Sequence, residues 1–349
     1  MIKVLIVDDS VLIQKVLSEI FSKAIGIEVV GVADDPYDAR DKIKLLKPDV
    51  ITLDIEMPKM DGITFLKNIM RLRPMPVVMI STLTQKGAPS TLEALEVGAV
   101  EYVGKPSADK PELLADYAEE IIEKVKTASV ANLNRLESQA SRAPLAISKP
   151  EKIGLSSTNI NTVIVIGAST GGTEAIRELL LMMPADCPPI LITQHIPPMF
   201  SASFAKRLNG NLPHEVHEAA DGDRVLAGNI YIAPGDRQME LLVKGGNYYC
   251  KIYDGERVNL HKPSVEVLFN SITKQCAKNT IGVMLTGMGA DGASAMRAMK
   301  DAGSYNIIQD EATSVVWGMP GAAAELGAGD KIMPLEHIAG HIVTQLKRR

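Results

Sequence analysis

Cysteines are scarce in this sequence of 349 residues, and their positions argue against two kinds of stabilisation. The three cysteines, Cys187, Cys250 and Cys276, are odd in number and lack the spacing of metal ligands. We therefore expect neither a disulfide framework nor a zinc site, and we interpret the three thiols as buried side chains.

Long apolar stretches are also absent. No run approaches the roughly 20 apolar residues that a helix needs to cross a bilayer. The first residues, Met-Ile-Lys-Val-Leu-Ile-Val-Asp-Asp, become acidic too early for a secretory signal. The hydrophobic fraction of 46% is that of an ordinary globular protein. We therefore expect a soluble, cytoplasmic protein with no direct membrane insertion.

An excess of positive charge is missing as well. The net charge is −5, which gives no electrostatic footprint for nucleic acid. A DNA-binding output module would need a compact basic helix-turn-helix, and the second half of the chain is too long for one. No nucleic-acid partner is expected. The length of the chain favours two domains with separate cores.

The N-terminal part alternates short apolar runs with amphipathic stretches. The five runs, interpreted as strands, are 2–7, 29–33, 50–53, 77–80 and 100–103. Strands that are apolar throughout are typical of a parallel sheet with helices on both faces. Residues 1–125 are therefore predicted to form a doubly wound, flavodoxin-like (βα)5 domain.

Polar residues follow the carboxyl ends of these strands, where open parallel sheets bind ligands. They are Asp8 and Asp9 after the first strand, Asp54 after the third, Ser81 after the fourth and Lys105 after the fifth. Crowded carboxylates need a cation, and Mg²⁺ prefers such oxygen ligands. The pattern predicts a phosphate site in which Asp54 is the nucleophile, Asp8, Asp9 and Asp54 hold Mg²⁺, and Lys105 neutralises charge. Ser81 would sense the product through a hydrogen bond, although any one of these residues alone could be a helix cap.

The combined pattern resembles response-regulator receiver domains over their whole length. The matching residues are Asp8-Asp9, Asp54, Ser81-Thr82 and Lys105-Pro106. The resemblance implies phosphorylation on Asp54, with a histidine kinase as the phosphodonor.

Residues 126–160 are predicted to be an interdomain linker. The stretch is rich in Ser, Ala and Asn, contains Pro144 and Pro150, and has no sustained periodicity. It cannot bury enough apolar surface to order itself alone. A helix that continues through Leu133 and Leu136 is the alternative for its first part.

Residues 161–349 are predicted to form a second domain, which opens with a glycine-rich turn. An apolar strand at 162–166 and a helix at 175–183 flank Gly167-Ala168-Ser169-Thr170-Gly171-Gly172. Gly-x-Ser-x-Gly on a strand-to-helix turn is typical of a hydrolase nucleophile, here Ser169. Two alternatives are a simple helix cap by Ser169 and a phosphate loop, but the Lys-Ser or Lys-Thr pair of such a loop is missing.

A nucleophilic serine needs a base, and the second domain contains all six histidines. Only His195 directly follows an expected strand, at 189–193, which places its imidazole at the same sheet edge as Ser169. We interpret the other five as solvated or structural, and His337 and His341 remain competitors for the role of base. Those five are His214, His217, His261, His337 and His341.

An orienting carboxylate is expected at a third strand end. The apolar run 281–285 precedes Thr286-Gly287-Met288-Gly289-Ala290-Asp291-Gly292, so Asp291 is the candidate. The same segment matches the Gly-x-Gly-x-x-Gly of dinucleotide sites, with Asp310 and Glu311 near the distance of a ribose-binding acid. Asp291 would then face the pyrophosphate, and this contact between like charges argues against a dinucleotide site.

Five segments of the second domain look like the chemotaxis protein-glutamate methylesterase (CheB) family. They are 167–172, 194–198, 261–265, 285–292 and 309–311 with 318–320. The resemblance implies a triad of Ser169, His195 and Asp291 on a Rossmann-like parallel sheet, with no cofactor in this domain. It also implies that the loop of Met288 helps to hold the oxyanion.

The resemblance further implies what the enzyme acts on. Its substrates would be glutamate γ-methyl esters and glutamine side chains on the helical cytoplasmic part of chemoreceptors, and its kinase would be the chemotaxis histidine kinase. Because a phosphoryl switch is joined to a catalytic domain, we expect the unphosphorylated N-terminal domain to inhibit the hydrolase.

Overall fold

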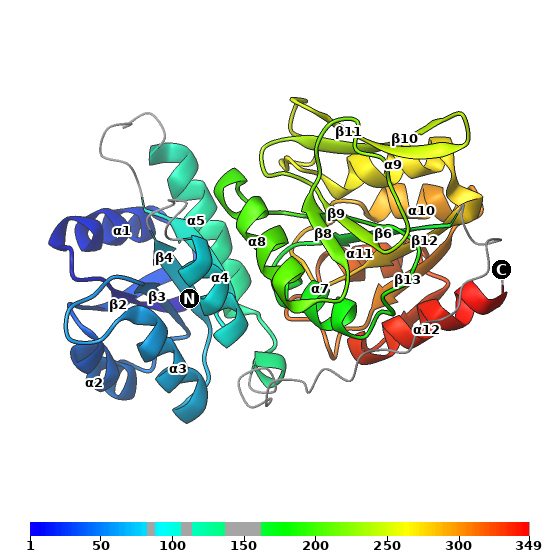
Figure 1. The fold of residues 1–349 in the computed structure, drawn as a ribbon. Coiled ribbons are helices and arrows are strands. Elements are labelled where there is room, and N and C mark those ends of the chain that lie inside the picture. Colours follow the sequence, from blue (N-terminus) through cyan, green and yellow to red (C-terminus); the bar gives the residue numbers. More distant parts are fainter. Residues whose placement is uncertain (82–87, 106–113, 137–161, 349) are drawn as a thin grey trace. The chain divides into compact units, whose positions relative to one another are not determined.

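The computed structural model describes residues 1–81, 88–105, 114–136 and 162–348, arranged in two compact units, Met1–Pro144 and Leu145–Arg349 (Figure 1). Most of the predicted linker lies outside the described residues. Within these ranges no helix is both long and apolar enough to span a membrane.

The first unit is built on a five-stranded parallel sheet with the strand order β2-β1-β3-β4-β5. The strands are β1 (Ile2–Val7), β2 (Ile27–Ala33), β3 (Val50–Asp54), β4 (Val77–Ser81) and β5 (Glu101–Gly104). The helices are α1 (Val11–Lys23), α2 (Pro36–Leu46), α3 (Gly62–Leu72), α4 (Ala88–Val97) and α5 (Leu114–Ser129). This order is that of flavodoxin-like folds, so the predicted doubly wound domain is confirmed.

Local sequence explains how the chain turns at the carboxyl ends of these strands. Every residue of β3 is buried, so Asp54 ends a strand that has helices on both faces. Ser10 caps α1 by accepting a hydrogen bond from the backbone N–H of Ile13, and Asp35 caps α2 in the same way. At the other end of the unit, α5 continues to Ser129, past the predicted domain boundary at 125.

The second unit contains a seven-stranded parallel sheet with the order β14-β13-β12-β6-β7-β9-β8. Its strands are β6 (Val163–Ala168), β7 (Ile190–Gln194), β8 (Glu215–Glu218), β9 (Asn229–Ile232), β12 (Thr280–Met284), β13 (Tyr305–Gln309) and β14 (Lys331–Met333). An antiparallel hairpin of β10 (Gln238–Lys244) and β11 (Asn247–Tyr253) stands apart from the sheet. The predicted Rossmann-like parallel sheet is confirmed.

Helices cover both faces of this sheet. They are α7 (Gly172–Leu181), α8 (Pro198–Asn211), α9 (Val265–Gln275), α10 (Ala293–Asp301), α11 (Met319–Glu325) and α12 (Leu335–Arg348), with a short 3₁₀ turn, η3, at Ala277–Asn279. The pair α9 and α10 lies on one face, and α7 with α12 lies on the other (Figure 1). The hairpin packs against α9 and extends this layer.

The strand order reverses at β6. From β6 the chain passes to β7 on one side, and it later returns to place β12 on the other side. All residues of these three strands are buried. A reversal of this kind opens a crevice at the carboxyl ends of the strands, where α/β proteins bind their ligands.

Candidate active site

Ser169 lies at the carboxyl end of β6, on a turn shorter than the sequence predicted. Strand β6 continues to Ala168 and helix α7 already begins at Gly172. Gly171 has φ 74°, and a Cβ at this position would lie 2.7 Å from the Cβ of Val315. The backbone N–H of Ser169 donates to the carbonyl of Thr286, 3.0 Å away, which ties the turn to the loop after β12. Glycine is thus required for a turn that presents the hydroxyl of Ser169 at the edge of the sheet.

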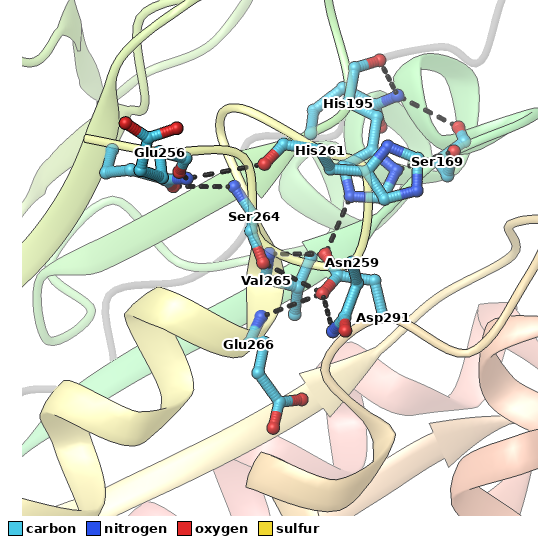
Figure 2. Close-up of polar contacts among 11 residues, drawn as sticks. Ser169, His195, Glu256, Asn259, His261, Ser264, Val265, Glu266 and Asp291 are labelled. Atoms are coloured by element: carbon cyan, nitrogen blue, oxygen red, sulfur yellow. Dashed lines mark hydrogen bonds and ion pairs between the residues drawn. The ribbon is translucent and has the colours of Figure 1, made fainter. Parts of the chain in front are cut away.

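His195 follows β7 directly and reaches the same edge. Its backbone N–H donates to the carbonyl of Ala168 at 3.2 Å. Its ring nitrogen Nδ1 lies 3.1 Å from Oγ of Ser169, and Nε2 lies 2.9 Å from Oδ2 of Asp291 (Figure 2). The structure therefore brings the three predicted site residues into one hydrogen-bonded chain.

Of the three hydrogen-bonded residues, Asp291 is held by a large set of hydrogen-bond donors. It is 2% exposed, and the backbone N–H groups at the start of α9 point at its carboxylate, as is usual for an anion at a helix N-terminus (Figure 2). Besides His195, its hydrogen-bond donors are Asn259 Nδ2 at 2.8 Å, Ser264 Oγ at 2.8 Å, the backbone N–H of Val265 at 2.7 Å and that of Glu266 at 3.3 Å.

These contacts determine the charge of Asp291. Burial raises the pKa of Asp291, but the hydrogen bond and charge of His195, with the hydrogen bonds from Asn259 and Ser264, lower it to about 2. The group is therefore a carboxylate at neutral pH, and it can stabilise a positive charge on His195.

The loop after β12 approaches Ser169 closely. A Cβ at Gly287 would lie 2.8 Å from the Cβ of Ser169, so only glycine fits there. The carbonyl of Gly287 accepts hydrogen bonds from the N–H groups of Gly318 at 3.0 Å and Met319 at 2.8 Å. Met288 is the next residue of this anchored loop and is 36% exposed. The suggested contribution of this loop to an oxyanion site remains a prediction.

His261, one of the histidines interpreted as solvated or structural, lies directly beside His195. Its ring stacks on that of His195 with the centroids 3.6 Å apart and an interplanar angle of 15° (Figure 2). No strand-end pattern predicts this contact, because His261 lies in the loop between β11 and α9. The available signal was the segment 261–265, which is among those that resemble the methylesterase family.

Three of the other histidines are bonded elsewhere. His214 pairs with the carbonyl of Pro184 at 2.9 Å, His217 with Oδ1 of Asn229 at 3.0 Å, and His341 with the hydroxyl of Tyr305 at 2.8 Å. Of the six histidines, all in the described part of the chain, the one bonded to Ser169 is His195. This geometry favours His195 over His337 and His341 as the base, and the assignment stays a prediction.

The alternative dinucleotide site gains no support from the position of Asp310. Its Oδ1 accepts hydrogen bonds from the backbone N–H of Thr313 at 3.0 Å and from its Oγ1 at 2.7 Å. The carboxylate is therefore engaged in a local turn.

A second cluster lies at the carboxyl ends of the strands in the first unit. Asp8, Asp9 and Asp54 offer carboxylate oxygens that lie within 4.8 Å of one another. Asp8 is 1% and Asp54 2% exposed. Hard oxygen ligands in this arrangement fit Mg²⁺. Lys105 Nζ lies 2.6 Å from Oδ2 of Asp54 and 3.1 Å from Oδ2 of Asp8.

The surroundings of Asp54 change its protonation. Its pKa is raised to about 6, mainly by burial; the hydrogen bond from Lys105 opposes this shift and the charge of Asp8 adds to it. Ser81 is the last residue of β4, but its side chain lies outside what the structure describes.

Comparison with known proteins finds a matching family model for each unit. Residues 4–118 match the family model of the response regulator receiver domain, and residues 164–342 match that of the CheB methylesterase. The chain belongs to the CheB methylesterase family.

Family members of similar length come from several bacteria. A protein of Hydrogenovibrio crunogenus named protein-glutamate methylesterase/protein-glutamine glutaminase is 49% identical, and the match covers 99% of each chain. One of Saccharophagus degradans with the same name, numbered 2, is 51% identical over 98% of each. The CheB methylesterase catalytic domain of Thermotoga maritima is 34% identical with a TM-score of 0.52, covering 53% of this chain and 98% of that one. The resemblance seen in the sequence is therefore confirmed.

Proposed function

We propose that this chain is a serine hydrolase that removes methyl groups from glutamate γ-methyl esters of chemoreceptors, deamidates receptor glutamines, and is activated by phosphorylation of Asp54. The observation that carries the proposal is the hydrogen-bonded chain of Ser169, His195 and Asp291 at the ends of three neighbouring strands. The names of the relatives supply the substrate class.

The chemistry follows from the atoms that face one another. As Oγ of Ser169 attacks the ester carbonyl, Nδ1 of His195 takes its proton, and the carboxylate of Asp291 stabilises the resulting imidazolium through Nε2. The loop of Met288 would offer a backbone N–H to the developing oxyanion. His195 then protonates the departing methoxide, which leaves as methanol, and a γ-glutamyl ester of Ser169 remains.

Hydrolysis of this acyl-enzyme completes the cycle. His195 takes a proton from water, the hydroxide attacks the acyl carbon, and the proton returns to Ser169 as glutamate is released. A glutamine side chain passes through the same acyl-enzyme, with ammonia as the leaving group. One site can therefore serve both reactions.

The first unit would receive the signal. The carboxylate of Asp54 attacks a phosphoryl group carried by a chemotaxis histidine kinase, and Lys105 neutralises charge on the transferring oxygens. Mg²⁺ held by Asp8, Asp9 and Asp54 would supply further neutralisation when bound. Ser81 would contact the phosphoryl product. Because the kinase and the helical part of the receptors are cytoplasmic, we infer that the protein acts there.

Methanol release from methylated receptor membranes by the purified full-length protein tests the proposal. Wild-type protein with a small phosphodonor should release methanol, and Ser169→Ala should release almost none. Thr344→Ala is a matched control, because this exposed hydroxyl bonds only within its own helix turn. Equal release by Ser169→Ala and wild type would refute the hydrolase mechanism and favour a role in binding alone.

A further inference from the structure

A second imidazole covers one face of the catalytic base. The rings of His261 and His195 stack with their centroids 3.6 Å apart and their planes 15° from parallel (Figure 2). The last torsion of a histidine side chain has a broad energy profile, so the orientation of the His195 ring needs outside support. Two hydrogen bonds fix the ends of the ring, and the stack fixes its plane.

A tight turn holds His261 in this position. Backbone hydrogen bonds join Val258 and His261 in both directions, at 3.0 and 2.9 Å. The two residues between them, Asn259 and Leu260, have φ of 52° and 70°. The side chain of Asn259 reaches Asp291. The same turn thus contacts both the base and its carboxylate.

A buried glutamine anchors both ends of the segment that carries this turn. Nε2 of Gln238, which is 1% exposed, donates to the carbonyls of Glu256 at 2.8 Å and His261 at 3.3 Å. Its Oε1 accepts from the backbone N–H of Ser264 at 2.9 Å. The position of His261 is therefore determined by the packed interior of the unit and not by the side chain alone.

His261 is uncharged at neutral pH, as a ring that stacks on an imidazolium should be. Its pKa is lowered to about 4, mainly by burial; electrostatic interactions with His195 and Arg257 act in the same direction, and the charge of Asp291 opposes them. The ring is neutral at neutral pH. The face of a neutral aromatic ring attracts a cation, whereas a second imidazolium would repel one.

We propose that His261 is a positioning residue for the hydrolase reaction: its neutral ring keeps the plane of His195 aligned with Ser169 and Asp291 and stabilises the imidazolium that forms during the reaction. The inference rests on the proposed function, because it assigns His195 as the base. His261 itself transfers no proton.

Two substitutions of similar volume separate the stacking role from other roles. His261→Phe keeps an aromatic face without ring nitrogens, and His261→Leu fills the space without an aromatic face. The assay is methanol release from methylated receptor membranes by the full-length protein with a phosphodonor, with thermal unfolding as the check on folding. We expect kcat to fall by about tenfold in His261→Leu and to stay within about threefold of wild type in His261→Phe, with KM unchanged in both.

His217→Ala is the matched control, because this exposed histidine bonds to Asn229 and not to the triad. Wild-type kcat in His261→Leu would overturn the inference. Equal loss in both variants would also overturn it, because the ring nitrogens would then be required. If His261→Leu fails to fold, a folded His261→Phe with wild-type kcat supports the inference and a folded one with tenfold lower kcat overturns it. Absence of methanol release by the wild type would instead count against the proposed function.

Discussion

Asp291 faces His195 through Oδ2, 2.9 Å from Nε2, and so leaves Nδ1 as the ring nitrogen directed at Ser169. In the chymotrypsin-type triad the ring takes the opposite orientation, with Nε2 toward the serine. Here the carboxylate selects the tautomer that carries its hydrogen on Nε2. The lone pair of Nδ1 is then free to accept the proton of the serine.

This relationship predicts the effect of Asp291→Asn. The amide N–H₂ of asparagine would face groups that now donate hydrogen bonds to the carboxylate, and two donors cannot bond to each other. The side chain would also no longer favour the His195 tautomer that carries its hydrogen on Nε2. We expect kcat for methanol release to fall by roughly 10³- to 10⁴-fold with little change in KM. The melting temperature should also fall, since the anion at the start of α9 is lost.

The control for this substitution is Asp301→Asn, an exposed member of an ion pair with Arg297 on α10. It should leave kcat unchanged. Activity of Asp291→Asn above one-tenth of wild type would show that the carboxylate is not needed to orient the base.

The triad as a unit makes a second prediction. Ser169→Ala and His195→Ala should each lose most activity without unfolding, and the double variant should be little slower than either single variant, because the two groups act in the same step. Methanol release by all three variants gives the comparison. Multiplicative losses in the double variant would mean that the two residues act independently.

Much of the fold and the outline of the site could be predicted from the sequence. Apolar runs that lack alternation predict parallel strands, and the residue after each run then lies at one edge of the sheet. This reasoning singled out Ser169, His195 and Asp291, which the structure brings together; their catalytic roles stay predictions. The acidic cluster of the first unit was found in the same way.

The rest of the site depends on contacts that no periodicity encodes. His261 and Asn259 lie on a turn between the β10-β11 hairpin and α9, and they reach the triad only because buried Gln238 fixes that segment. The hairpin itself was not predicted: its strands mix buried and partly buried residues without a regular alternation, and they do not pair with the main sheet. Such packing across distant segments appears only once the chain is folded.

The raised pKa of Asp54 predicts a dependence of stability on pH. Its value rises from 3.8 to about 6 on folding, so the folded state binds the extra proton within this window. The stability of the first unit should therefore fall as the pH rises from 3.8 to about 6 and stay low above it. Asp54→Asn removes the buried charge and should raise the melting temperature above pH 6, with little difference below pH 4. Lys105 keeps Asp8 as a partner in this variant.

Calorimetry of the full-length protein, once above pH 6 and once below pH 4, measures this difference in melting temperature. Asp41→Asn, at an exposed carboxylate, is the control and should show no such dependence. A lower melting temperature of Asp54→Asn at neutral pH would mean that the ion pair with Lys105 outweighs the cost of burying the carboxylate.

The acidic cluster also predicts that phosphorylation needs a divalent cation. Removal of Mg²⁺ by a chelator should abolish phosphate incorporation from a small phosphodonor, and excess Mg²⁺ should restore it, because three crowded carboxylates repel a phosphoryl group. Asp54→Asn should incorporate none under either condition. Incorporation at the normal rate by Asp54→Asn would place the phosphorylated residue elsewhere.

The last prediction concerns inhibition of the second unit by the first. A flexible tether of the predicted kind gives an effective concentration of about 1 mM, so a contact with a Kd of about 0.1 mM would keep the crevice at Ser169 about 90% covered. Phosphorylation of Asp54 needs a coupling of only about 1–3 kcal/mol to open most molecules. Activation should then be about tenfold.

A fragment that begins near residue 158 tests this occlusion directly. The catalytic domain of the Thermotoga maritima relative is known as a separate structure, which supports independent folding of the fragment. On methylated receptor membranes the fragment should equal or exceed the phosphorylated full-length protein and should not respond to a phosphodonor. A fragment as slow as the unphosphorylated full-length protein would mean that the first unit activates the catalytic site positively, because removing a cover would then have had no effect.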